Sequence, residues 1–120
     1  MIDHFSITVK DIERSKDFYK KVLAPLHGEL KLAFDGAANF GKIDVAGGQF
    51  WLAQGEPKPN HFAFRADSKE EVAAFYTAGL EAGGTDNGGP GLRPEYHEKY
   101  YAAFIIDPDG YNIEAVYYGE

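Results

Sequence analysis

Cysteine is absent from this 120-residue sequence. The absence excludes disulfide bonds, thiolate metal sites and cysteine nucleophiles, and it leaves the redox compartment open. Positive charge is also scarce, because 12 lysine and arginine residues stand against 19 acidic residues, for a net charge of −7. Nucleic acids and anionic membrane surfaces both favour clustered positive charge, so neither is an expected partner.

Long apolar runs are missing as well, and no segment is long enough to span a bilayer. Met1 is followed directly by a strand pattern rather than by a basic leader with an apolar core, so we expect a cytoplasmic protein. What is abundant is apolar and aromatic surface, at 44% and 15% of residues. A chain of this length and composition is expected to fold as one domain, residues 1–120, around a substantial core.

The closing segment of the chain has the pattern of a β-hairpin. An apolar run, Phe104–Ile106, is followed by the turn sequence Asp107–Gly110 and then by a second strand, Asn112–Tyr118. Glu114 lies inside that second strand between two apolar neighbours. A carboxylate in such a place is costly to bury unless a cation or a hydrogen-bond donor compensates it. The sequence therefore predicts a partner for Glu114.

The remaining chain contains short strand patterns and two helical patterns. Asp11 and Ser68 are expected N-caps, and Glu71 is placed to complete a capping box with Ser68. Strands are predicted at 2–9, 30–34, 40–45, 49–54 and 61–64, and a long loop, with room for a short strand, at 85–98.

The two halves repeat at a fixed offset of 57 residues. The matching pairs are His4 and His61, Phe5 and Phe62, Phe18 and Phe75, Tyr19 and Tyr76, and Leu23 and Leu80. Each half reads as strand, helix, then three strands, which predicts an α+β fold of two packed modules, about 1–56 and about 57–120. A sheet built from two such units would curl around a central cleft.

Paired histidines at His4 and His61, with the run Asp107–Glu114 near the end, resemble the vicinal oxygen chelate superfamily. That group includes glyoxalase I, extradiol dioxygenases, and fosfomycin and bleomycin resistance proteins. The segment Asp11–Tyr19 is similar to the family's first helix, and the resemblance covers essentially the whole chain. It implies two βαβββ modules that form a cupped mixed sheet around a divalent metal.

By position, the resemblance assigns the metal ligands to His4, His61 and Glu114. Two imidazoles and one carboxylate leave open coordination positions, and such a set suits Zn, Fe, Mn, Ni or Co. The metal would act as a Lewis acid on two neighbouring oxygens of a small-molecule substrate. Trp51 stands where glyoxalase I, a lactoylglutathione lyase, has a fourth ligand, and indole does not ligate metals. A three-ligand site, as in the dioxygenase or fosfomycin branch, therefore fits better.

A second cluster precedes the closing hairpin. His97 and Tyr101 are candidate catalytic acid–base groups near the metal. An amphipathic strand with aromatic packing explains them equally well, and a solvated loop arginine explains Arg93. Candidate substrate-binding residues are Trp51, Arg93, Tyr96 and Tyr100. The long loop before the hairpin is expected to shape or gate this site.

Two functions follow from this pattern. The first is a metal-dependent vicinal-oxygen-chelate enzyme with lyase, dioxygenase or transferase activity on a small molecule. The alternative is a metal-free protein of the bleomycin-resistance type that binds and sequesters a ligand in an aromatic cleft. The resemblance also implies a homodimer. Metal analysis separates the two functions.

Overall fold

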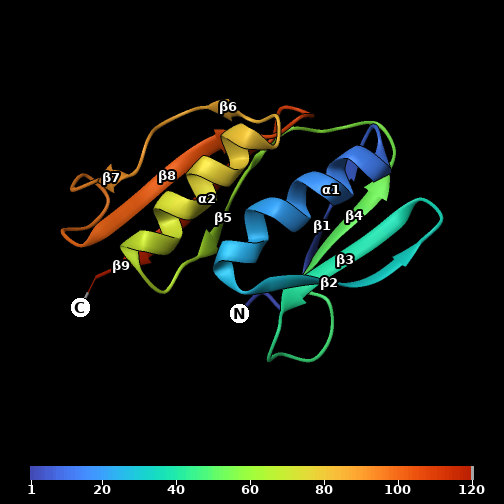
Figure 1. Ribbon diagram of the computed structural model, residues 1–120, viewed down its shortest axis with the longest axis horizontal. Helices are drawn as coiled ribbons and strands as arrows, with labels where there is room; N and C mark the ends of the chain where they lie inside the picture. The colour runs from blue at the N-terminus through green and yellow to red at the C-terminus, as the bar shows by residue number, and fades with distance from the viewer. Residues whose placement is uncertain (120) are drawn as a thin grey trace.

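The computed structural model describes residues 1–119, in which each half of the chain forms a βαβββ module (Figure 1). The first module comprises β1 (Phe5–Val9), α1 (Ile12–Leu23), the 3₁₀ turn η1 (Ala24–Leu26), β2 (Gly28–Phe34), β3 (Ala37–Lys42) and β4 (Phe50–Gln54). The second comprises β5 (His61–Arg65), α2 (Lys69–Glu81), β6 (Thr85–Asp86), β7 (Gly91–Leu92), β8 (Tyr100–Ile106) and β9 (Asn112–Tyr118). The predicted α+β class with paired modules is confirmed. None of the helices in the described residues is long and apolar enough to cross a membrane.

Each module contributes one mixed sheet, and the two sheets have equivalent strand orders and directions. The first sheet has the order β1-β4-β3-β2, and the second has the order β5-β9-β8-β6, with β7 also paired to β8. The first strand of each module lies at a sheet edge and pairs in parallel with the last, while the other pairs are antiparallel. In the second module, two short strands inside the predicted loop replace one longer strand.

Local sequence chemistry sets the helix starts as expected. The Asp11 side chain accepts the backbone N–H of Arg14, and the Ser68 hydroxyl accepts that of Glu71 at 3.1 Å. The side chain of Glu71 in turn accepts the backbone N–H of Asp67 at 2.8 Å. Both predicted N-caps are confirmed, and they fix the residue at which each helix begins.

Two predicted strands have different bounds in the structure. The first begins at Phe5 rather than Ile2, because β4, its only ladder partner, begins at Phe50 opposite Phe5. The strand predicted at 40–45 runs instead from Ala37 to Lys42, because these residues lie opposite the two ends of its antiparallel partner β2. A turn follows at once, with the N–H of Val45 bonded to the carbonyl of Lys42.

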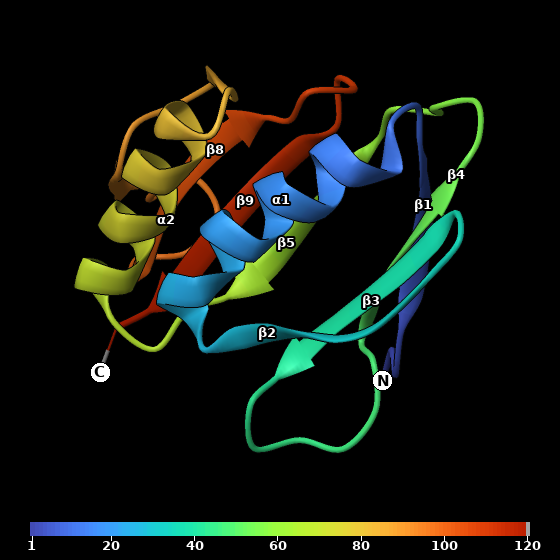
Figure 2. The same ribbon diagram turned by 45° about the vertical axis from the view of Figure 1, so that its right-hand side comes forward.

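One core joins the two modules. The helices α1 and α2 lie side by side in both views, and the inward faces of both sheets pack against them (Figure 1, Figure 2). Strand alternation places Ile7 and Val9 in this core, at 3% and 0% exposure, and turns Ser6 away from it. The opposite face of each sheet is free of helices.

The edge strands β1 and β5 belong to separate sheets and run past each other in opposite directions (Figure 2). The start of β1, at Phe5, and the end of β5, at Phe64 and Arg65, line a common cavity. At the other end, the hydroxyl of Tyr111 donates to the carbonyl of Thr8 at 2.6 Å and accepts the N–H of Lys58 at 3.1 Å. The first residues of the two strands therefore lie at opposite ends of the seam between the modules.

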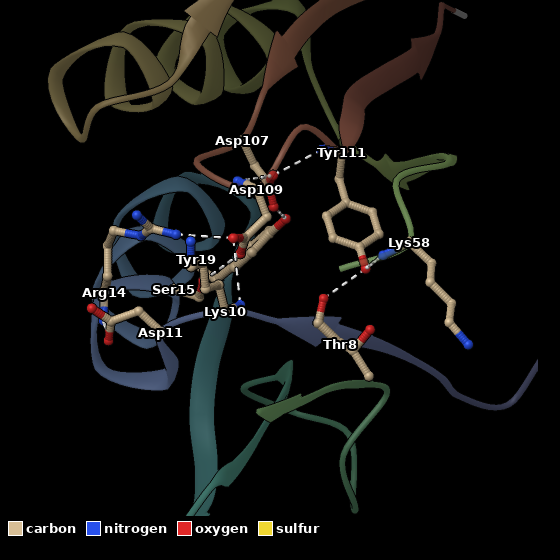
Figure 3. Close-up of polar contacts among 10 residues, drawn as sticks. All are labelled: Thr8, Lys10, Asp11, Arg14, Ser15, Tyr19, Lys58, Asp107, Asp109 and Tyr111. Atoms are coloured by element: carbon tan, nitrogen blue, oxygen red, sulfur yellow. Dashed lines mark hydrogen bonds and ion pairs between the residues drawn. The ribbon is translucent and has the colours of Figure 1, made fainter. Parts of the chain in front are cut away.

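The turn Asp107–Gly110 also holds the modules together (Figure 3). The Asp107 side chain accepts the backbone N–H groups of Asp109 and Tyr111, each at 2.9 Å, and the hydroxyl of Tyr19 from α1 at 2.5 Å. Asp109 accepts an N–H of the Arg14 guanidinium at 2.9 Å. This turn thus ties the closing hairpin to the first helix.

Candidate metal centre

Glu114 occupies the middle of the second sheet. It pairs with Ala63 on β5 and Phe104 on β8, so its side chain leaves the sheet on the face away from the helices. Its neighbours Ile113 and Ala115 point into the core and are both fully buried. Despite lying on the outer face, Glu114 is only 2% exposed. A carboxylate buried to this degree requires compensation of its charge.

Two side chains contact this carboxylate from the same face. Nε2 of His61 lies 3.1 Å from Oε1 of Glu114, and the hydroxyl of Tyr100 donates to Oε2. The His61 ring stacks beside Phe104, with centroids 6.1 Å apart. Within residues 1–119, no lysine or arginine forms an ion pair with Glu114. The sequence predicted a partner for this carboxylate, and the structure provides two: an imidazole and a phenol.

The hydrogen bond at the far side of the His61 ring determines what the ring offers Glu114. Nδ1 lies 2.9 Å from the carbonyl oxygen of Asn112, which can only accept, so Nδ1 carries a proton. A neutral ring then presents the lone pair of Nε2 to Glu114, which is also an acceptor. The contact is satisfied by a proton shared between the two groups or by a metal cation bound to both. This donor set fits a divalent metal.

Tyr100 holds the other carboxylate oxygen. Burial, and then the hydrogen bond to Glu114, raise the pKa of the Tyr100 phenol above its ordinary value. Tyr100 therefore remains a neutral donor near pH 7 and fixes the orientation of Glu114. Outer-shell donors of this kind typically orient ligating carboxylates.

His4 lies apart from this pair. It is exposed just before β1, and its Nδ1 is 2.7 Å from Oδ1 of Asp3, which leaves Nε2 on the outer side of the ring. Among residues 1–119, the one group of three potential ligands within 4.8 Å does not include it. The expected convergence of His4, His61 and Glu114 thus does not occur inside one chain, because β1 and β5 run in opposite directions.

That group of three is formed by His27, Asp67 and Glu71. Nε2 of His27 lies 2.9 Å from Glu71, whose other oxygen is used at the N-terminus of α2. Lys42 approaches Asp67 at 3.7 Å. The positive helix end and the lysine already compensate these carboxylates, so the cluster is a structural link between the modules.

Within residues 1–119, neither of the two predicted acid–base residues forms a hydrogen bond or ion pair with Glu114. Tyr101 leaves β8 on the helix side, where its ring centroid is 5.2 Å from Nζ of Lys69. His97 is exposed, its Nδ1 accepts the N–H of Lys99 at 3.0 Å, and its ring contacts Tyr118. Strand parity is the reason for the first difference, because neighbouring residues of a strand face opposite sides.

The predicted substrate-binding residues divide between the two sheets. The Arg93 guanidinium donates to the carbonyls of Gly89 and Gly91, both at 2.8 Å, and lies over the Phe104 ring. It therefore shapes the loop beside the site. Tyr96 is exposed and packs on Tyr100 with centroids 5.1 Å apart.

Trp51 lies on the first sheet, between Ser6 and Asn39, on the outer face of that sheet. It occupies the position in the first module that Glu114 occupies in the second. The outer face of the first sheet therefore carries an indole where the second carries the carboxylate.

The sequence did not reveal the groups that orient the two candidate histidine ligands. Asp3 orients His4, and the Asn112 carbonyl orients His61. Their signal was available in part, because Asp3 directly precedes a candidate ligand. The role of Asn112 depends on the parallel pairing of β5 with β9, which no local pattern reveals.

A fold of paired modules, with an imidazole and a carboxylate on an open sheet face, is characteristic of a class of proteins that bind small molecules. A family model described as the glyoxalase/bleomycin resistance protein/dioxygenase superfamily matches residues 1–115, and the chain belongs to this superfamily. No curated protein matches the sequence.

Solved structures show the same fold over nearly the full length. A glyoxalase/bleomycin resistance protein from Albidiferax ferrireducens is 31% identical, with a TM-score of 0.84 over 96% of this chain and 97% of that one. The fosfomycin resistance protein FosX from Mesorhizobium loti is 19% identical, with a TM-score of 0.71 over 100% of this chain and 92% of that one. A family enzyme from Burkholderia phytofirmans is 16% identical, with a TM-score of 0.76 over 98% of each chain. The two more distant structures establish the fold alone.

Proposed function

We propose that this protein is a metal-dependent enzyme of the vicinal oxygen chelate type, acting on a small molecule with two adjacent oxygens. The observation that carries the proposal is the His61–Glu114 contact. A carboxylate that is 2% exposed faces the lone pair of an imidazole whose other nitrogen is held by a carbonyl. A divalent cation satisfies both groups at once.

The third ligand is His4 of a second copy of the chain. His4 is exposed, and Asp3 holds its Nδ1 so that Nε2 faces outward. The outer face of each sheet is free of helices, and β1 and β5 are both edge strands. A two-fold dimer that sets the first sheet of one chain against the second sheet of the other supplies a His4 to each His61–Glu114 pair. Trp51 would then form an aromatic wall over the substrate.

The chain's own residues have distinct tasks in this scheme. A metal held by His4, His61 and Glu114 would supply a Lewis acid for two neighbouring substrate oxygens. Tyr100 keeps Glu114 oriented and stays protonated, since its pKa is raised. The loop that Arg93 holds over Phe104 forms a side wall and limits access of water. Lyase, dioxygenase and transferase chemistry all fit this arrangement.

Elemental analysis of protein purified without chelator tests the proposal. We expect about one metal per chain, lost in Glu114→Gln and in His61→Ala and retained in the control His27→Ala. His27 is a matched control because it is also an exposed histidine beside a glutamate. Circular dichroism establishes that each variant is folded. A metal-free wild-type protein that gains no thermal stability from Zn, Mn, Fe, Ni or Co would refute the metal site.

A metal-free binding protein of the bleomycin-resistance type is the second candidate. One observation favours it: no buried side-chain nitrogen or oxygen in the described part of the chain lacks a hydrogen-bond partner. A protonated His61 and the hydroxyl of Tyr100 together satisfy Glu114 without a metal. Retention of small-molecule binding by metal-free protein, unchanged in Glu114→Gln, would support this function over the enzyme.

A further inference from the structure

The cavity at the seam between the modules has a volume of about 380 Å³ and lies away from the candidate metal centre. It lies where β1 and β4 begin and where β3 and β5 end, whereas His61 is at the opposite end of β5. Its aromatic lining comes from the helix-facing sides of the sheets, whereas Glu114 lies on the other face. The volume falls within the range of about 300–1,000 Å³ typical of small-molecule sites.

The floor and walls of this cavity are apolar. Phe40 and Phe50 are 1% and 3% exposed, and Leu23 and Leu26 are each 5% exposed. Half-buried Phe5 and Phe64 form the sides, and the ring of Phe50 packs against both, with centroids 5.2 Å and 5.4 Å away. An apolar ligand body would be removed from water on several sides here.

The polar groups at the rim are mainly donors. Lys42 and Arg65 both line the rim: the Lys42 ammonium lies 3.7 Å from Asp67, and the Arg65 guanidinium lies over the Tyr118 ring on the outer face, 4.9 Å from its centroid. Gln49 uses its side-chain oxygen on the backbone N–H of Lys42, at 2.8 Å, so its amide offers donors to the cavity mouth. The one acid at the rim, Asp3, already contacts His4 at 2.7 Å. In a chain of net charge −7, this is a locally cationic opening.

We propose that this cavity binds a small amphipathic anion: an aryl or medium-chain aliphatic body with a single carboxylate or sulfonate group. The phenylalanine and leucine walls receive the apolar body, and Lys42 and Gln49 receive the head group. A neutral apolar ligand would leave these donors unused, and a cationic one would meet Lys42 at the entrance. The proposed ligand contacts lie outside the proposed metal centre, although Asp3, which holds His4, is at the cavity rim.

Fluorescence titration with 8-anilinonaphthalene-1-sulfonate, in the presence of chelator, provides the test. We expect saturable binding that decanoate displaces and that decyltrimethylammonium, with the same chain and the opposite charge, does not. Lys42→Gln should weaken binding about five-fold, as expected for loss of one partly exposed charge contact. Lys20→Gln removes an exposed lysine of α1 outside the cavity and should leave binding unchanged.

Amide chemical-shift mapping on the wild-type protein places the ligand without any variant. Decanoate should shift the resonances of Phe40, Phe50 and Phe64 and leave those of His61 and Glu114 in place. Equal displacement by decyltrimethylammonium, equal affinity of Lys42→Gln, or shifts centred on Glu114 would each overturn the proposal. Because chelator is present throughout, either outcome leaves the metal centre to its own test.

Discussion

The hydroxyl group of Tyr19 donates a hydrogen bond of 2.5 Å to Oδ2 of Asp107, across 88 positions of sequence. Tyr19 is fully buried and Asp107 is 4% exposed. The same aspartate accepts two backbone N–H groups of its own turn. One side chain therefore shapes the closing hairpin and attaches it to α1 of the first module.

Removing this contact should weaken the joint between the modules. Tyr19→Phe keeps the ring but leaves Oδ2 of Asp107 buried without its donor, which typically costs about 1–3 kcal/mol. Urea unfolding measures the change in the free energy of unfolding. Tyr117→Phe is the control, because Tyr117 is a half-buried tyrosine of β9 that packs against the same core. Equal losses in the two variants would contradict the assigned role.

Alkaline pH should destabilise the fold through the same residue. Burial, and then the charge of Asp107, raise the pKa of Tyr19 well above its ordinary value. The folded chain keeps a proton that the unfolded chain releases above about pH 10, so the stabilisation is complete below that pH and is lost as the pH rises further. Unfolding free energies between about pH 9 and 11 should fall less steeply in Tyr19→Phe than in the wild type. Parallel slopes would contradict this assignment.

A dimer-shared metal site makes a sharp prediction for mixed variants. Neither His4→Ala nor His61→Ala should bind metal alone. A refolded equal mixture should recover about a quarter of the wild-type metal, because half of the randomly formed dimers are mixed and each has one intact site. Elemental analysis after gel filtration measures the recovery. A site built within one chain would recover nothing, as would the control mixture of His4→Ala with Glu114→Gln,His4→Ala.

Arg93 should act on the loop rather than on a substrate anion. Both of its contacts are carbonyls of its own loop, Gly89 and Gly91, and its guanidinium stacks on Phe104. Arg93→Ala should speed amide exchange in residues 86–92 several-fold while the free energy of unfolding changes by less than about 1 kcal/mol. Amide exchange at wild-type rates would contradict this role and leave Arg93 a candidate for substrate binding.

Much of the fold was predictable because its signals are local. Asp11 and Ser68 cap their helices whatever the tertiary structure around them, and the turn residues Asp107–Gly110 define a hairpin by themselves. The 57-residue repeat predicted two modules, since equivalent sequences form equivalent units. The ends of β3 were less predictable, because a strand ends where its partners end.

The candidate site was predictable only in part. The hairpin register pairs Phe104 with Glu114, which already sets Tyr100 on the carboxylate's face and Tyr101 on the other. Deriving this register requires the length of the turn between the two strands. The sequence suggested that length, and the structure established it. The separation of His4 from His61 had no local signal at all.

The sequence by itself determined both helices, most of the strands and the two modules, and it named the side chains proposed to hold a metal, because periodicity, capping and turn chemistry act over a few residues. Only the tertiary structure decided that His61 meets Glu114, that Tyr100 completes the pair and that His4 remains outside it. Those relationships depend on the pairing of β5 with β9 and on how the first module packs against the second, and both are set by contacts between residues far apart in the chain.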